Sequence, residues 1–345
     1  MPSAQPLKAV FTGAQSTPSG TWISGAATLG VDRAAVLLRQ DDATDRLVVM
    51  DRRSPEVTPL LEGECDGWVC VFDAETDRLV IEMNRRIFVF DASSLAPVGE
   101  LSPAPRRALG ELAPGGRVLI TGSDAAWTLW DLRTLSVIAR DDQRVVRHWW
   151  VGPRATDPLI LLRSVVQDGR WRTWTERADT RETLREAVVA VSEPCETTAA
   201  LLPGGETWLG VVTEGQDSTW GPSGLRWFTA HGPQTLLSLG PVRGAPSVIR
   251  LIVLTSEHVY IQGGGHHHLL HLPTATLRPC PQDHHVSPSG MMLSGDGVAF
   301  DPWSGGVAEL RRPNAHRPSG IAISPDGLTA LVSTPDALEW WALTP

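Results

Sequence analysis

Residues 112–131 read LAPGGRVLITGSDAAWTLWD, and this stretch contains the pattern from which the fold can be predicted. A Pro-Gly-Gly turn at 114–116 precedes a β-type run at 118–120, and a second apolar run at 126–129 ends in Trp130-Asp131. Proline sets φ at the second position of a tight turn, and glycine supplies positive φ after it. The stretch is therefore typical of short antiparallel strands that are introduced by a hairpin turn.

The strand end Trp130-Asp131 recurs along the chain at an interval of forty residues. Phe90-Asp91 lies forty residues earlier, and Met50-Asp51 lies forty residues before that. Weaker copies of the strand end follow at Trp174, Trp227, Leu270, Phe300 and Trp341. Eight copies in 345 residues give a mean spacing of about 43, inside the ~40–45 residues of a four-stranded propeller blade.

Turn sequences and the two chain ends support the same repeat. The turns at 203–205, 288–290 and 325–327 each precede a β-rich run, and we interpret each one, like 114–116, as the hairpin between a first and a second strand. The last third strand, near Trp341, has no fourth strand after it. Residues 8–12 would supply that strand and remove the last free sheet edge.

One segment, residues 179–187, leaves two interpretations open. It reads DTRETLREA, in which Asp179 and Glu182 match a helix capping box. It is therefore either a short helical insertion or a polar outer strand, and of the two we prefer the strand.

Taken together, the apolar-Asp strand ends, the Pro-Asp-Gly-like turns and the period of about forty residues resemble the WD40-type β-propeller, in its degenerate bacterial form. The clearest matches are residues 112–131 and residues 323–333, ISPDGLTALVS. The resemblance implies one all-β domain over residues 1–345. This domain would be a closed propeller of eight four-stranded antiparallel blades, or of seven, the family's common number. The N-terminal strand would complete the last blade. The Gly-His pair that opens the family's repeats is missing, so its Asp-His-Ser/Thr-Trp network is not expected.

Composition excludes several classes of function. Of the 30 basic residues only Lys8 is a lysine, and its surroundings match no Walker A, Schiff-base or kinase lysine. The sequence contains no Gly-x-Ser-x-Gly, His-Glu-x-x-His or Gly-x-Gly-x-x-Gly motif. The net charge of −9 argues against a nucleic-acid binder, since such domains are usually basic. We therefore expect no enzymatic activity and no cofactor.

The cysteines and the N-terminal sequence bear on the compartment. Four cysteines are too few for a disulfide scaffold in a chain of this length. Neither a signal-peptide pattern nor an apolar run of about 18 residues is present. We expect a cytoplasmic protein that does not bind membranes.

His266, His267 and His268, with His271, form the most conspicuous cluster of titratable residues. Strand alternation would place two of them on each face, fewer than the three or four ligands of a zinc site. We interpret the cluster as solvated histidines at the tip of a glycine-rich hairpin, and no metal site is expected, although the sequence does not settle whether these side chains bind metal.

Most of the 14 tryptophans lie on the repeat as packing residues between blades, but Trp149, Trp150 and Trp220 do not. Trp220 is expected on a long loop between residues 214 and 224. Hairpins between second and third strands share one rim of a propeller with the connections between blades. Arginine and tryptophan on such a rim are the residue types that dominate protein interfaces. The candidate residues, called the predicted rim, are Arg85, Arg86, Asp124, Arg170, Trp220, His266 and His267.

The resemblance implies a non-enzymatic protein-interaction scaffold, or a regulatory subunit of a bacterial signalling or defence assembly, whose partner is another protein or a peptide segment. The alternative is a propeller hydrolase or lyase with a site at the channel mouth, which needs inward-facing carboxylates or histidines where the predicted first strands are mainly apolar. A third hypothesis, nucleic-acid binding by the arginines of the rim, predicts steep salt dependence. The sequence determines neither the partner nor the oligomeric state.

Overall fold

The structure is a computed structural model in which 32 strands and one 3-10 helix, η2 (Leu272–Thr274), lie within the described residues. The described residues are 7–40, 44–63, 70–73, 76–83, 86–101, 111–112, 118–123, 126–141, 146–151, 158–193, 195–216, 219–229, 231–241, 249–263, 266–280, 284–287, 289–310, 318, 320–324, 326–334 and 337–344.

In these ranges the strands form eight four-stranded antiparallel sheets, and seven of the sheets consist of four strands that are consecutive in sequence. The first four sheets are β2(Trp22–Leu29), β3(Arg33–Arg39), β4(Asp45–Asp51) and β5(Val57–Gly63); β6(Cys70–Asp73), β7(Arg78–Met83), β8(Arg86–Asp91) and β9(Pro97–Leu101); β10(Glu111–Leu112), β11(Val118–Ser123), β12(Ala126–Asp131) and β13(Ser136–Asp141); and β14(Val146–Val151), β15(Leu159–Gln167), β16(Arg170–Arg177) and β17(Thr183–Ala190).

The other four sheets follow in the same order, except that the last one takes its fourth strand from the start of the chain. They are β18(Cys195–Leu201), β19(Trp208–Gln216), β20(Thr219–Thr229) and β21(Gly232–Pro241); β22(Arg250–Val253), β23(His258–Gly263), β24(His266–His271) and β25(Thr276–Pro279); β26(His284–Val286), β27(Met292–Ser294), β28(Val298–Phe300) and β29(Val307–Glu309); and β30(Gly320–Ile323), β31(Thr329–Ser333), β32(Ala337–Thr344) and β1(Lys8–Ser16).

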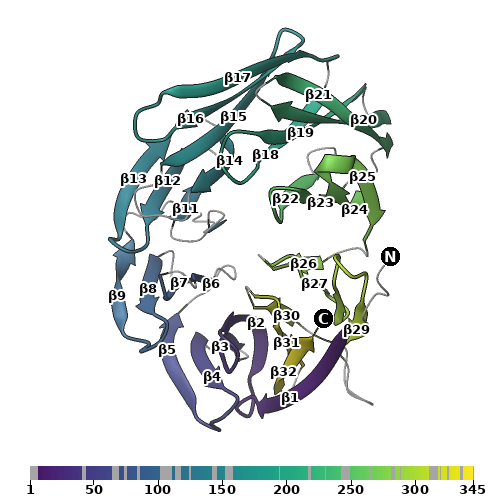
Figure 1. The fold of residues 1–345 in the computed structure, drawn as a ribbon. Coiled ribbons are helices and arrows are strands. Elements are labelled where there is room, and N and C mark those ends of the chain that lie inside the picture. Colours follow the sequence, from purple (N-terminus) through teal and green to yellow (C-terminus); the bar gives the residue numbers. More distant parts are fainter. Residues whose placement is uncertain are drawn as a thin grey trace.

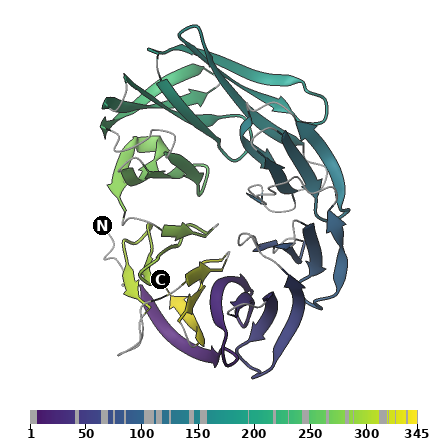
Figure 2. The ribbon, with the colours of Figure 1, turned by 180° about the vertical axis from the view of Figure 1, so that it is seen from behind.

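The sheets follow one another in chain order around a ring (Figure 1), and the same ring is seen from behind in Figure 2. First strands such as β6, β22 and β26 lie towards the middle, and fourth strands such as β9, β13 and β17 lie on the outside. The first strand of the first sheet, β2, contacts both β6 of the next sheet and β30 of the last one.

The predicted repeat is confirmed strand by strand. Each of the eight predicted strand ends lies in the third strand of a different sheet. Residues 203–205, 289–290 and 326–327 lie between first and second strands, as predicted, while residues 114–116, 288 and 325 lie outside the described residues. Residues 183–190 form the outer strand β17, so the strand interpretation of that segment is confirmed.

The two ends of the chain meet in one sheet, as we predicted from the β-type sequence of residues 8–12. β1 runs antiparallel to β32, from the pair Lys8 and Thr344 to the pair Ser16 and Ala337. The Thr12 hydroxyl donates a hydrogen bond to the Trp340 carbonyl at 3.0 Å, and the rings of Phe11 and Trp341 meet edge to face at 5.5 Å.

The hydrophobic core lies between the sheets. Between the β14–β17 and β18–β21 sheets, Trp171, Trp208 and Phe228 are at most 2% exposed, and Phe228 stacks on Trp208 at 5.3 Å. Between the last and first sheets, Trp340 packs with Val36 and Met50. Strands alternate their side chains between two faces, so every sheet with a neighbour on each side buries both faces.

The aspartate at the end of a third strand shapes the turn to the fourth. The Asp91 carboxylate accepts hydrogen bonds from the backbone N–H of Ser94, at 2.9 Å, and from the hydroxyls of Ser93 and Ser94. Asp131 and Asp301 likewise accept backbone N–H groups two residues later. Short polar side chains of this kind favour turns by bonding to the backbone that follows them.

The residue four positions after the strand end adopts a left-handed conformation and reaches the neighbouring sheet. Leu95 has a φ of 60° and Leu135 a φ of 54°. Leu95 packs into the core between the first two sheets, and Leu135 lies so close to Gly99 of β9 that a Cβ there would be 2.6 Å from its Cδ1 atom. In these turns, a leucine in the left-handed conformation thus contributes its side chain to the contact between two sheets.

We predict that Gly210→Ala lowers the free energy of unfolding by about 1–3 kcal/mol, because a Cβ on Gly210 would collide with the Trp171 indole and lie 2.9 Å from Phe228. Gly224→Ala in the adjacent strand is the matched control. Its Cβ would meet Val212 at an ordinary 3.5 Å, so it should change stability by less than about 0.5 kcal/mol. Denaturant unfolding measures both variants, and equal effects would contradict this packing.

We also predict an acid-dependent contribution from Asp91. The Ser94 N–H, and after it the Ser93 and Ser94 hydroxyls, hold the pKa of Asp91 well below its usual range. A carboxyl whose folded pKa is depressed stabilises the fold above its unfolded pKa of about 3.9, and this stabilisation is lost as pH falls towards the folded pKa. The difference in unfolding free energy between wild type and Asp91→Asn should therefore shrink as pH drops below about 4. A constant difference over that range would contradict the prediction.

Candidate interaction surfaces

The hairpins that connect second and third strands mark the position of the predicted rim. The tip of the hairpin between β15 and β16 is fully described. Asp168 and Gly169 both have positive φ, at 51° and 69°, and the Gly169 N–H donates to the Glu193 carboxylate at 2.7 Å. Arg170 follows this turn as the first residue of β16, and its side chain is exposed. Arg170 is thus available at the rim.

Arg86 is exposed at the start of β8, but its guanidinium has partners within its own sheet. It forms a two-pronged ion pair with Glu100 of β9 and lies 5.4 Å from the centre of the Phe88 ring. The hydrogen bond to Glu100 raises the pKa of Arg86 above its usual value. Arg86, Arg170 and His267 lie in three sheets that are not neighbours, so these residues are spread around the ring rather than gathered in one site.

The expectation for Trp220 is wrong. Trp220 lies in strand β20, paired with Gly215 of β19, and not on a long loop. A register shift between Thr213 and Gly215 lets the two strands continue pairing to Gln216 and Thr219. The strand-forming residues Thr219 and Trp220 therefore extend the hairpin instead of leaving it.

The described side chains of the histidine cluster, His267, His268 and His271, are half-buried, so they are in contact with solvent but also with their own sheet. His267 is half-buried, and its Nδ1 atom lies 3.3 Å from the hydroxyl of Tyr260, the chain's single tyrosine, which is itself fully buried. His268 is also half-buried, and burial, followed by the proximity of His267, lowers its pKa. Pairing with β23 and β25 on both sides places β24 inside its sheet.

The remaining positions of the predicted rim are described in part or not at all. Arg85 and Asp124 lie outside the described residues. His266 is described as a backbone position of β24. Trp149 and Trp150, the other two tryptophans outside the repeat, are described as backbone positions of β14.

The opposite end of the ring carries an aromatic cluster that the sequence analysis missed. Trp303, in the turn between β28 and β29, is 40% exposed. Its ring meets the edge of His258 at 4.5 Å, and His258 lies 4.8 Å from the ring of His271. The Trp303 Nε1–H donates to the Ser289 carbonyl at 3.4 Å. Two neighbouring sheets thus hold one exposed indole in a fixed orientation.

Charged groups surround this cluster, which we call the Trp303 cluster (Trp303, His258, His271 and Ser289). Arg278 donates to the Pro302 carbonyl at 2.8 Å, and Glu257 lies 3.9 Å from the Nε2 atom of His271. Burial, followed by the proximity of His271, lowers the pKa of His258. The lowered pKa favours the neutral form of His258, whose ring lies nearly perpendicular to that of Trp303, at an interplanar angle of 80°.

The repeat itself contains a signal for Trp303. Trp303 is the second residue after the strand-end Asp301, the position of Ser93 after Asp91 and of Arg133 after Asp131. Those two side chains are exposed, so a tryptophan at this position also faces solvent. Alignment of the turns, rather than of the strands, would have found it.

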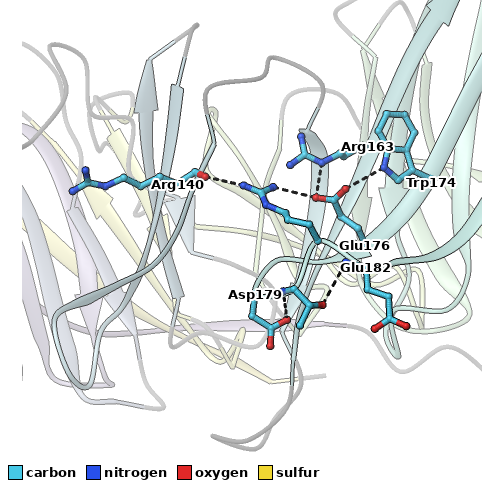
Figure 3. A network of polar contacts seen from close by, with 8 residues as sticks. Arg140, Arg163, Trp174, Glu176, Asp179 and Glu182 are labelled. Atoms are coloured by element: carbon cyan, nitrogen blue, oxygen red, sulfur yellow. Dashed lines mark hydrogen bonds and ion pairs between the residues drawn. The ribbon is translucent and has the colours of Figure 1, made fainter.

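A buried polar network connects the β14–β17 sheet to its predecessor (Figure 3). Arg163 and Glu176, on paired strands, form an ion pair at 2.8 Å, and their side chains are only 4% and 9% exposed. The same carboxylate accepts hydrogen bonds from Arg181 at 3.1 Å and from the Trp174 indole at 3.2 Å. Arg181 also donates to the carbonyl of Arg140 in β13, at 2.8 Å, and so joins the two sheets.

Within the described part of the chain, no group of three or more His, Cys, Asp or Glu side chains is placed to hold a metal ion. The same residues contain no helix with the length and hydropathy needed to cross a bilayer.

Comparison with known proteins gives a likeness in structure alone. No family model matches the sequence, and no curated protein matches it. Among solved structures, the chain is similar to the C-terminal WD40 domain of Sif2, with a TM-score of 0.58 and 10% sequence identity over 97% of this chain and 100% of that one. A chain of the mitotic checkpoint complex matches with a TM-score of 0.48 and 15% identity, over 82% of this chain and 92% of that one.

At 10% identity the likeness to the Sif2 domain concerns the fold. It confirms the expected WD40-type propeller architecture, and the all-β composition agrees with it.

We predict that Glu176→Gln lowers the free energy of unfolding by about 3 kcal/mol, because it leaves the Arg163 charge buried without its counter-ion. The double variant Arg163→Met/Glu176→Leu should recover most of that loss, since it removes both charges and keeps the volume. Denaturant unfolding of the single and double variants measures the coupling. A double variant less stable than Glu176→Gln would contradict the role of the buried charge.

Proposed function

We propose that the chain is one closed propeller of eight blades over residues 1–345, and that it serves as a non-enzymatic scaffold that binds another protein. The eight four-stranded sheets, the contact between β2 and β30, and the pairing of β1 with β32 support closure with eight blades rather than seven. The likeness to a WD40 domain over 97% of the chain supports a single domain.

The observation that carries the binding function is the exposed Trp303 on a rigid support. Tryptophan is among the residues that contribute most to protein interfaces, and a side chain held in one rotamer before binding loses little entropy when the partner arrives. His258, the Ser289 carbonyl and the close approach of Gly290 hold the indole in place. The Trp303 cluster is therefore the main docking point in this proposal.

The predicted rim is a second docking point in the proposal, on the other end of the ring. Arg170 is its best described member, exposed beside the Asp168-Gly169 turn. Docking there is expected to depend on arginine contacts with carboxylates of the partner. A partner that spans both ends of the channel would use both points.

The assembly that we propose is a bacterial signalling or defence complex in the cytoplasm. The support for this is the degenerate bacterial form of the repeat, with its missing Gly-His pairs, and a net charge of −9 that disfavours nucleic acid as the partner.

Affinity purification from the native host tests the function and separates the two docking points. Trp303→Ala should reduce recovery of the partner at least tenfold, the loss expected of an interface hot spot of about 1.4 kcal/mol or more, while Arg170→Ala reports on the rim. Arg140→Ala, which removes an exposed arginine side chain from the outer strand β13, is the matched control. Thermal unfolding checks that all three variants fold. Full recovery of the partner with both Trp303→Ala and Arg170→Ala would show that neither surface is the docking site.

A further inference from the structure

Among the described residues, the fourth strand of every sheet has one edge without a strand beside it, and in β17 this edge is long and free of proline and glycine. β5, β9, β21 and β25 contain proline, β1 contains glycine, and the two others that contain neither, β13 and β29, are shorter, with six and three residues. β17, with the sequence TLREAVVA, is the longest fourth strand that contains neither proline nor glycine. The one register shift in its pairing with β16 lies at Leu184, so residues 185–190 pair without interruption. A long edge of this kind is a template for pairing with another strand.

The hydrogen bonds between β16 and β17 show which backbone N–H and C=O groups of β17 point away from the sheet. The Val191 N–H donates to the Gly169 carbonyl at 2.9 Å, and Val189 and Ala187 lie opposite Trp171 and Thr173. In an antiparallel pair, alternate residues direct their N–H and C=O groups towards the neighbouring strand. The groups of Glu186, Val188 and Ala190 are therefore directed away from the sheet.

The side chains along this edge are apolar or already neutralised. Leu184 and Val188 are 43% and 48% exposed. Glu186 forms a two-pronged hydrogen-bonded ion pair with Arg172, at 2.8 and 3.0 Å, and Arg172 lies 4.9 Å from the centre of the Trp174 ring. Arg185 pairs with Glu206 at 3.3 Å. The edge thus carries no unpaired charge that would repel an identical strand.

We propose that β17 pairs antiparallel with β17 of a second copy of the chain, about a two-fold axis at Ala187. Charge disfavours the registers centred nearer the start of the strand. Centres at Arg185 or Glu186 would place two like charges opposite each other, which is unfavourable across a strand pair. With the axis at Ala187, Glu186 of each copy lies opposite Val188 of the other, and Leu184 lies opposite Ala190.

The same register suits the backbone. All the outward-directed groups of Glu186, Val188 and Ala190 then face strand residues of the other copy. The two Ala187 residues form a directly opposed pair without hydrogen bonds, whose Cα atoms lie about 4.5 Å apart, and their small side chains permit that approach. β17 lies on the outer perimeter of the ring (Figure 1), so the pairing leaves both ends of the ring open to other partners.

Site-directed cross-linking tests this register. In Ala187→Cys the two thiols of a dimer would lie within disulfide range, because Cα atoms about 4.5 Å apart satisfy its geometry. In Ala190→Cys the two thiols would be six residues apart along the strand, about 20 Å. Ala190 is exposed and Ala187 half-buried, so random collision would favour cross-linking at position 190.

Under mild oxidation Ala187→Cys should form a disulfide-linked dimer at least tenfold faster than Ala190→Cys, with oxidised wild type as the control for the native cysteines. Equal rates, faster linkage at position 190, or no dimer in either variant would overturn the proposal.

Analytical ultracentrifugation of the full chain gives an independent test without new cysteines. Wild type should show a dimer fraction that rises with protein concentration. Val188→Pro removes an outward N–H at an edge, where proline is tolerated, and should weaken the dimer at least tenfold. Val188→Thr keeps the N–H and the branched shape and should dimerise like wild type. A wild type that is monomeric at all concentrations, or a Val188→Pro dimer of unchanged strength, would overturn the proposal. If Val188→Pro does not fold, the cross-linking comparison decides.

Discussion

Face-to-face packing between neighbouring sheets is the constraint on which the rest of this structure depends. A single four-stranded sheet cannot bury either face by itself, so each repeat acquires a core only when its neighbours are in place. The stack around Trp171, Trp208 and Phe228 shows how tight the contact is, since only a glycine at position 210 leaves room for it. The stability of any one sheet is thus shared with the sheets on both sides.

The turns between third and fourth strands are where this packing is coupled to the local sequence. The strand-end aspartate organises the turn, and the left-handed residue four positions on projects towards the preceding sheet. Leucine at that position makes an apolar contact, whereas Arg181 makes hydrogen bonds to Glu176 and to the β13 backbone instead. One turn geometry therefore supports both an apolar and a polar connection between sheets. The polar version carries the cost of desolvating Arg163 and Glu176, which the several donors to the carboxylate offset.

Surfaces suited to binding arise where single positions depart from the repeat. The turn position that elsewhere holds Ser93 or Arg133 holds Trp303, and β17 is the longest outer strand that contains neither proline nor glycine. Neither departure disturbs the core, because Trp303 and, in β17, Leu184 and Val188 remain exposed at 40%, 43% and 48%. A rigid ring can thus vary its partners by substitutions that leave its packing unchanged.

Much of the fold could be predicted from the sequence, because hydrogen bonding within a strand pair and the chemistry of tight turns are local. The period of about forty residues, the eight third strands, the first hairpins and the use of residues 8–12 beside the last strand all followed from local patterns. What only the tertiary structure decided is which side chains meet solvent and which meet each other. Trp220 continues a hairpin across a register shift, and His267 contacts Tyr260 inside its sheet. Trp303 is fixed by His258, 45 positions earlier in the sequence and on a different sheet. The exposure of a side chain depends on which residues of the neighbouring sheet cover it, and these residues are distant in the sequence, so a local pattern cannot predict it.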